Sequence, residues 1–185
     1  MKKIVPYQFI VLEGISGSGK TEIGTRLSEQ IDAQYYTTPP ALFREIRDRA
    51  DRTLSLQSRF LFYLSSVVQA SREIDGILER RSVVCDKYIW STICYHVVYG
   101  LNVVVPPRFT YRQPDYAFLL ICEDGTRLRR IRNRGDVEDA EDNLRQEMER
   151  KCLVEFRKHL KWEVDNTAEG PQRTVEEILT VIQKR

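Results

Sequence analysis

Residues 14–21 are the part of the chain best suited to chemistry, because they match the phosphate-binding pattern G-x-x-x-x-G-K-[ST]. Glycines let the backbone fold around a polyphosphate so that its N–H groups point inward. We expect Lys20 to reach the β- and γ-phosphates of a triphosphate and Thr21 to place its hydroxyl on Mg²⁺. The other phosphate contacts are expected from Gly14, Ser16, Gly17, Ser18 and Gly19.

The segments on either side of this loop have the patterns that such a site requires. Residues 9–12 are a continuous apolar run, typical of a buried strand, and Ile23, Leu27 and Ile31 recur afterwards at helical spacing. A helix beginning at the loop adds a dipole that favours anions. The alternative, a chance glycine-rich turn, does not account for this context.

Asp86 and Lys87 follow a second apolar run, residues 82–85. Phosphoryl transfer needs an acid for the metal and cations for the phosphates. Asp86 is expected beside the loop, where it could hold Mg²⁺ directly or through water. It could instead cap the next helix, and the two roles are compatible. Lys87 could bind the phosphate of an acceptor or be a solvated surface lysine.

Five arginines lie between residues 127 and 134. On a helix, Arg127, Arg130 and Arg134 share one face, whereas Arg129 and Arg132 point elsewhere. They could form a solvated basic face, or supply a mobile arginine that closes over ATP, which can contribute about 10³–10⁵ in rate. The acidic run 135–142 that follows is interpreted as a hinged loop.

The elements that must position these side chains alternate between strand and helix. Short strands are predicted at residues 9–12, 33–38, 82–86, 116–122 and 162–165. Helices are predicted after the loop and at residues 41–51, 54–79, 89–98, 126–134 and 141–160, and a final helix is expected to open with a capping box at Thr174. This order predicts an α/β fold with a five-stranded parallel sheet covered on both faces. Ligands should lie at the carboxyl ends of the strands.

Length and composition are those of a globular domain. The chain has 185 residues, 42% hydrophobic and 30% charged, and one domain spanning residues 1–185 is the simplest interpretation. A net charge of +2 gives no reason to expect nucleic acid or anionic membrane as a partner, and no apolar run is long enough to span a membrane. The four cysteines form no C-x-x-C pair, so we interpret them as reduced, mostly buried thiols of a cytoplasmic protein.

Taken together, these motifs resemble the thymidylate kinase family of nucleoside monophosphate kinases. Residues 12–21 look like its Glu-Gly entry and phosphate loop, and Asp86-Lys87-Tyr88, Ser91 and Tyr95 are similar to its Asp-Arg-Tyr…Ser…Ala-Tyr segment. Residues 113–115 and 130–135 resemble its Pro-Asp strand start and its lid entry, and Leu61-Phe62 its Leu-Phe pair. Pro39-Pro40, Phe62-Tyr63 and Ser91-Thr92 look closest to the mitochondrial UMP-CMP kinase branch.

The resemblance implies a three-layer α/β/α sandwich of the P-loop kinase type that uses ATP and Mg²⁺, with a lid at about residues 134–145 and a homodimer packed through long helices. It implies that Lys20, Asp86, Arg132 and Arg134 are catalytic and that Thr21 and Asp86 hold the metal. Arg130 would join the loop in binding ATP. The acceptor would be held by Pro39, Arg47, Phe62, Lys87, Ser91 and Tyr95, with Phe62 stacking on its base.

The chain also departs from the family pattern where the acceptor is read. The thymine-contacting arginine falls on Ser66, the family's Asp-Arg pair has become Asp86-Lys87, and the glutamine after Tyr95 is His96. Gly17 stands where many members carry an acid or an arginine, so the catalytic cations would have to come from the lid. Lysine keeps the charge of arginine but loses its bidentate fork.

Three functions are compatible with these residues. The first is Mg-ATP-dependent phosphorylation of a pyrimidine nucleoside monophosphate, of the dTMP type or UMP, CMP or dUMP. The second keeps ATP but has a nucleoside or specialised metabolite as acceptor, and the third is a nucleotide-binding module without transfer activity. Loss of turnover in Lys20→Ala and Asp86→Ala would favour a kinase.

Overall fold

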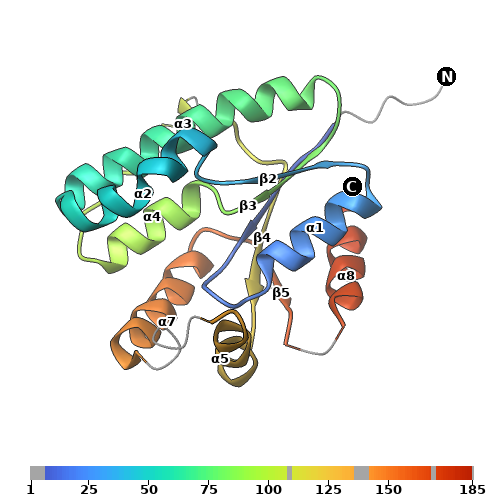
Figure 1. The fold of residues 1–185 in the computed structure, drawn as a ribbon. Helices are drawn as coiled ribbons and strands as arrows, with labels where there is room; N and C mark the ends of the chain where they lie inside the picture. The colour runs from blue at the N-terminus through green and yellow to red at the C-terminus, as the bar shows by residue number, and fades with distance from the viewer. Residues whose placement is uncertain (1–6, 108–109, 136–141, 168–169, 185) are drawn as a thin grey trace.

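The computed structural model describes residues 7–107, 110–135, 142–167 and 170–184. Its centre is a five-stranded sheet in the order β2-β3-β1-β4-β5, in which every neighbouring pair is parallel (Figure 1). The strands are β1 (Phe9–Glu13), β2 (Gln34–Thr37), β3 (Val83–Asp86), β4 (Tyr116–Ile121) and β5 (Trp162–Asp165). All five predicted strands are confirmed, and no end is shifted by more than one residue.

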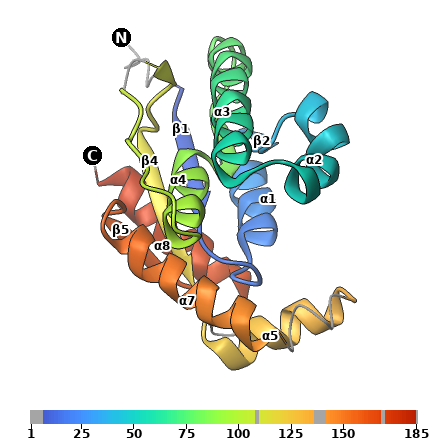
Figure 2. The same cartoon turned by 90° about the vertical axis from the view of Figure 1, so that its left-hand side faces the viewer.

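Helices cover both faces of the sheet (Figures 1 and 2). The helices are α1 (Lys20–Gln30), α2 (Ala41–Thr53), α3 (Leu56–Leu78), α4 (Ile89–Val98), α5 (Asp124–Asn133), α7 (Asn143–Arg157) and α8 (Pro171–Gln183). One face packs against α1 and α8, and the opposite face against α3, α4 and α7. The predicted α/β/α sandwich is therefore confirmed.

The alternation of the strands explains why two cores form. In β1, Phe9 and Val11 join the core beneath α3 and α4, whereas Ile10 and Leu12 join the core beneath α1 and α8. All four are less than 2% exposed. A central parallel strand must be apolar on both sides, which is why β1 shows no polar alternation in the sequence.

Two helix ends can be compared with the sequence signals that predict them: the start of α8 is wrong and the stop after α5 is confirmed. The capping box predicted at Thr174 is wrong: α8 begins at Pro171 after Gly170, and the buried Thr174 donates its hydroxyl to Asn166 Oδ1 at 2.9 Å. Proline is well suited to the first helical position because its missing N–H is not needed there. The stop predicted at Gly135 is confirmed, with φ at 88° and its N–H donated to Arg132 O at 2.9 Å.

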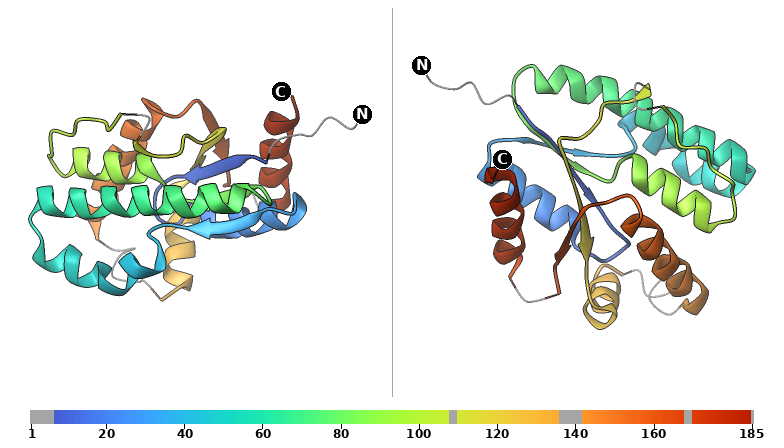
Figure 3. Two further views of the ribbon diagram at one scale, coloured as in Figure 1. Left: turned by 90° about the horizontal axis from the view of Figure 1, so that it is seen from above. Right: turned by 180° about the vertical axis from the view of Figure 1, so that it is seen from behind.

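The arrangement brings several chain segments to one end of the sheet. The loop after β1, the turn after β2 and the end of β3 lie together at the carboxyl ends of the strands, and α5 lies at the same end (Figures 1 and 3). In register, Leu12 pairs with Asp86 and Asp86 with Thr37. The fold thus gathers the residues that the sequence singles out.

Two further findings concern the cysteines and the lengths of the apolar helices. All four cysteines are buried free thiols, as expected. Among the described residues, none of the helices combines the length and apolar character that a membrane span needs.

Candidate active site

The loop between β1 and α1 is held in a shape that requires glycine. Gly14 has φ at 145°, and a Cβ there would lie 2.5 Å from Leu120 O. Gly19 has φ at 93°, and its Cβ would meet Asn166 Nδ2 at 2.2 Å. That amide nitrogen donates to Ser18 O at 2.9 Å, so Asn166 supports the loop from the end of β5. The glycine pattern therefore reflects close backbone packing as well as phosphate access.

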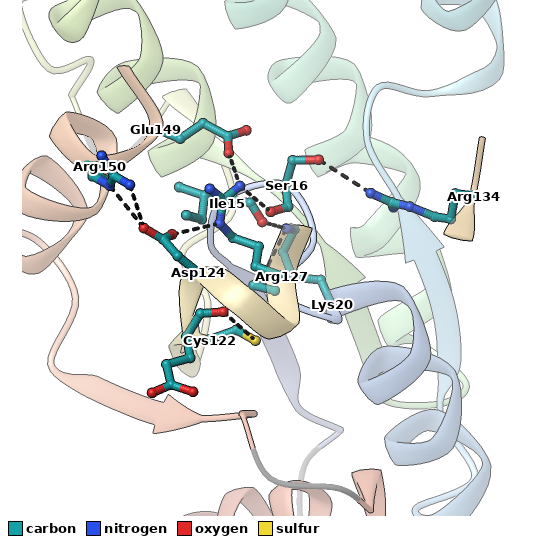
Figure 4. Close-up of polar contacts among 11 residues, drawn as sticks. Ile15, Ser16, Lys20, Cys122, Asp124, Arg127, Arg134, Glu149 and Arg150 are labelled. Carbon is teal, nitrogen blue, oxygen red and sulfur yellow. Dashed lines mark hydrogen bonds and ion pairs between the residues drawn. The ribbon is translucent and has the colours of Figure 1, made fainter. Parts of the chain in front are cut away.

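Lys20 lies inside the loop with its ammonium group already positioned (Figure 4). It is 6% exposed, and its Nζ donates to Ile15 O at 2.7 Å and Ser18 Oγ at 3.2 Å. Burial, with a contribution from the nearby Lys87 charge, lowers the pKa of Lys20 to about 8. Because a buried cation gains from a neighbouring anion, the loop favours a phosphate at this point.

Asp86 ends β3 beside this loop, as predicted. Its Oδ2 accepts hydrogen bonds from Thr21 Oγ1 at 2.8 Å and from Tyr35 OH at 3.1 Å. Its Oδ1 is buried and has no hydrogen-bond partner in the part of the chain that the structure describes. A carboxylate oxygen left unpaired beside a threonine hydroxyl fits Mg²⁺, which is usually held by one or two carboxylates together with substrate phosphates.

Glu13, which the sequence analysis gave no role, caps α4. It is fully buried at the end of β1, and its Oε1 accepts from the backbone N–H groups of Tyr88, Trp90 and Ser91 at 3.1–3.2 Å. Its Oε2 accepts from Ser91 Oγ at 2.5 Å. Burial raises the pKa of Glu13 to about 7. The capping that was an alternative for Asp86 is thus performed by Glu13, which ties α4 to the phosphate loop.

For Arg127, the alternative that α5 presents a solvated basic face is wrong, because this side chain is buried. It is 1% exposed and donates to Glu149 Oε2 at 2.5 Å, to Asp124 Oδ1 at 3.2 Å and to Ser16 O at 3.3 Å (Figure 4). A Cβ on Gly17, whose φ is 79°, would lie 2.7 Å from Arg127 Cγ. Arg127 supports the loop from behind, and the glycine at position 17 leaves room for it.

The remaining arginines of α5 divide between the loop and solvent. Arg130 donates to Asn166 O at 3.0 Å, and Arg134 donates to Ser16 Oγ at 3.5 Å. Both line the cavity in front of the loop, whereas Arg132 is exposed and is not part of that lining. Residues 136–141 of the expected lid lie outside the described residues.

Two cavities open at this end of the sheet and share part of their walls. The loop cavity has a volume of about 900 Å³ and is lined by loop residues, Lys20, Thr21, Asp86, Arg130 and Arg134. The helix cavity has a volume of about 370 Å³ and lies among α2, α3 and α4. Thr38, Arg47 and Lys87 line both cavities. Two ligands could therefore meet at these three residues.

The helix cavity contains most of the residues predicted to hold an acceptor. Pro39, Arg47, Lys87, Ser91 and Tyr95 line it. Phe62 does not line it. The centroid of its ring lies 5.4 Å from that of Phe43 and 5.3 Å from that of Tyr63. Tyr63 is the aromatic residue that α3 contributes to the cavity wall. Stacking of Phe62 on a base would require its ring to turn toward the cavity, and it stays a prediction.

Some further cavity residues, Asp51, Arg59 and Tyr99, were missed because no local pattern marks them, whereas Ser66 and His96 are positions at which the chain departs from the family pattern. The wall also includes Asp51, Arg59, Ser66, Thr92, His96 and Tyr99. Tyr63 OH donates its one proton to the Asp51 carboxylate, whose two oxygens lie 2.8 and 2.9 Å from it. The spacing of Arg59, Tyr63 and Ser66 by four and three residues on α3 is the one signal that could have grouped part of this set.

Comparisons with known proteins agree with this geometry. The profile of the thymidylate kinase family matches residues 12–178. A protein of Methanocaldococcus jannaschii described as a probable thymidylate kinase is 31% identical over 150 residues, which cover 77% of this chain and 78% of that protein. One of Pyrococcus horikoshii with the same description is 28% identical over 173 residues, covering 81% of each chain.

Solved structures show the same fold. The thymidylate kinase of Candida albicans superposes with a TM-score of 0.73 at 17% identity, over 97% of this chain and 92% of that one. The thymidylate kinase of Ehrlichia chaffeensis gives a TM-score of 0.65 at 20% identity, over 95% and 98%. Because the family profile spans most of the chain and a relative of the same description is 31% identical to it, the chain belongs to the thymidylate kinase family of nucleoside monophosphate kinases.

Proposed function

We propose that this protein transfers the γ-phosphoryl group of ATP to the 5′-phosphate of a pyrimidine nucleoside monophosphate, with dTMP as the first candidate. The observation that carries the proposal is the junction of the two cavities at Thr38, Arg47 and Lys87. A donor triphosphate on the loop and an acceptor phosphate in the helix cavity would approach each other there. The names of the family and of its relatives support dTMP as acceptor.

On the donor side, the loop N–H groups and Lys20 bind the triphosphate, and Arg130 lines the same cavity. Thr21 and Asp86 would hold Mg²⁺, which when bound neutralises charge on the β- and γ-phosphates. Breaking the hydrogen bond from Thr21 Oγ1 to Asp86 Oδ2 would free these two oxygens to bind the metal. Phosphoryl transfer depends mainly on positioning and electrostatics, so these preformed contacts supply what the reaction needs.

On the acceptor side, Lys87 and Arg47 hold the 5′-phosphate at the junction. Lys87 has φ at 66°, unusual for a residue with a side chain, and its N–H donates to Leu12 O at 2.9 Å. The sharp turn thus fixes Lys87 immediately after the carboxylate Asp86. Pro39, Ser91 and Tyr95 line the cavity around the sugar and base of the acceptor.

Arg134 and Arg132 would stabilise the migrating phosphoryl group from a lid at about residues 134–145. Arg134 already lines the loop cavity and donates a long hydrogen bond, at 3.5 Å, to Ser16 Oγ of the phosphate loop. Arg132 is exposed and would have to turn inward to take part. A single kinase domain covering residues 1–185 is the framework for these roles.

Transfer of labelled phosphoryl from [γ-³²P]ATP to a panel of nucleoside monophosphates tests the proposal. A labelled diphosphate should form with at least one pyrimidine monophosphate in the presence of Mg²⁺. Lys20→Ala and Asp86→Ala should abolish it, whereas Lys151→Ala, which removes a surface lysine of α7 that is 57% exposed, should not. Label appearing only on a nucleoside or a non-nucleotide alcohol would reject the proposed acceptor.

We further propose a cytoplasmic homodimer packed through helices that include α3, as the family resemblance implies. Light scattering after size exclusion should give twice the 21.7 kDa mass of the chain, and a monomer at micromolar concentration would reject the dimer.

A further inference from the structure

Tyr35, on the edge strand β2, contacts the carboxylate of Asp86 from outside the loop cavity. Its hydroxyl donates to Asp86 Oδ2 at 3.1 Å, and the same oxygen accepts from Thr21 Oγ1 at 2.8 Å. Thr21 and Asp86 line the loop cavity, whereas Tyr35 is not part of its wall as the described residues define it. Tyr35 can therefore act on a ligand in that cavity only through the residues it touches.

The hydroxyl of Tyr35 is a donor in this contact. Burial, together with the charge of Asp86, raises the pKa of Tyr35 well above its usual range. The hydroxyl therefore keeps its proton at neutral pH, and an ionised carboxylate can only accept. A hydrogen bond to an ionised acceptor is stronger than one between neutral groups. The contact thus restrains the orientation of the Asp86 carboxylate.

The ring of Tyr35 is held in place by a glycine of α1. Thr37 pairs with Asp86 and Tyr35 with Val84, so Tyr35 and Asp86 share the face of the sheet that α1 covers. Gly24 is buried inside α1, where glycine is unfavourable. A Cβ there would lie 2.7 Å from Tyr35 Cε2 and 3.3 Å from Cδ2. The glycine allows the ring to lie against the helix backbone and reach the strand end.

The next residue, Tyr36, makes a contact of the same kind on the opposite face of the sheet. Its hydroxyl donates to Glu73 Oε2 of α3 at 2.7 Å, and its ring packs on the core beneath α3 and α4. Neither Tyr36 nor Glu73 belongs to the described wall of either cavity. Two adjacent tyrosines therefore each donate to a carboxylate, but only Tyr35 does so at the phosphate loop.

We propose that Tyr35 is a positioning residue that holds the Asp86 carboxylate beside the Thr21 hydroxyl for binding Mg²⁺. The inference rests on the proposed function, in which Thr21 and Asp86 hold the metal. Outer-shell partners orient the carboxylates that bind metals, and losing one typically weakens metal affinity about 10–100-fold. Without the Tyr35 hydroxyl, the described residues offer Asp86 Oδ2 one donor, Thr21 Oγ1, and that oxygen is itself needed for the metal.

Binding of a fluorescent, non-hydrolysable ATP analogue, followed by its anisotropy as Mg²⁺ is added, tests this role without turnover. In Tyr35→Phe, the Mg²⁺ concentration that half-saturates binding should rise about 10-fold. The affinity for the same analogue in EDTA should be unchanged, because Tyr35 does not line the cavity. Gly24→Ala gives an independent second variant. It should raise the half-saturating concentration as well and add little to Tyr35→Phe, because it displaces the same hydroxyl.

Tyr36→Phe is the matched control, because it removes a hydroxyl that donates to a carboxylate away from the loop. It should leave the half-saturating Mg²⁺ concentration unchanged. Equal shifts in Tyr35→Phe and Tyr36→Phe, or no shift in Tyr35→Phe while the wild type binds with Mg²⁺ and phosphorylates dTMP, would overturn this inference alone. Absence of any Mg²⁺-dependent binding by the wild-type protein would instead remove the proposed function and this inference together.

Discussion

The buried pair of Arg127 and Glu149 allows a quantitative prediction about how the phosphate loop is supported. Arg127 is 1% exposed and Glu149 is 5% exposed, and the guanidinium also reaches Ser16 O. In Arg127→Met, an apolar side chain of similar length replaces the cation, and Glu149 is left buried without its ion-pair partner.

The size of the effect follows from what remains around Glu149. Removing one partner of a buried ion pair costs about 3–5 kcal/mol. The Ser16 backbone N–H still donates to Glu149, so we expect a loss near the lower end, about 3 kcal/mol. Arg127→Met/Glu149→Leu leaves no unpaired charge and should recover most of this loss.

Urea unfolding at pH 7, followed by the fluorescence of Trp90 and Trp162, measures these differences. Arg150→Met is the matched control, because it removes an arginine from an exposed pair with Asp124 (57% and 40% exposed) and should cost at most about 1 kcal/mol. The reasoning is refuted if Arg127→Met costs no more than Arg150→Met, or if the double variant is less stable than Arg127→Met alone.

Two further predictions concern glycine and pH. Gly17→Ala should lower the free energy of unfolding by about 2 kcal/mol or more in the same assay, because φ is 79° and the new Cβ would press on Arg127. The control is Gly76→Ala on α3, where the new Cβ meets nothing within 4 Å, and it should raise the free energy of unfolding by about 0.5–1 kcal/mol. Equal effects of the two substitutions would contradict the packing argument. Glu13 binds a proton more tightly when folded, since its pKa rises from 4.5 to about 7, so its contribution is present below pH 4.5 and is lost as the pH rises toward 7, by roughly 3 kcal/mol. Glu13→Gln stays neutral and should flatten this slope; an unchanged slope between pH 4.5 and 7 would exclude Glu13 as its source.

The sequence predicts the sheet and the phosphate loop because their signals are local. Apolar runs such as residues 9–12 and the glycine spacing of residues 14–21 depend on neighbours in the chain, and they identify the strand ends where Asp86 and Lys87 lie. The supporting residues have no such signal. Asn166 contacts Ser18 across 148 positions, and Glu13 contacts Tyr88 across 75. Such contacts depend on the order of the strands, which short motifs do not encode.

The residues whose surroundings the sequence does not reveal show the same limit. Helical spacing groups Arg127 with Arg130 and Arg134, but it does not say which side of α5 faces the loop, and Arg127 lies in the interior. Phe62 and Tyr63 are adjacent on α3 and point about 100° apart, so which ring lines the cavity depends on how the helix is oriented in the fold. His96 likewise contacts Thr92 O and the rings of Phe60 and Tyr63 on α3, and only the folded structure brings these rings to it.

A crystal structure with an adenosine–thymidine dinucleotide joined by five phosphates would test the central claim most directly, because this compound spans donor and acceptor sites at once. The account predicts phosphates on the loop beside Lys20, a chain of phosphates passing Lys87 and Arg47, and the thymine in the helix cavity. A thymidine half bound outside the helix cavity, with Lys87 and Arg47 free of phosphate, would contradict it.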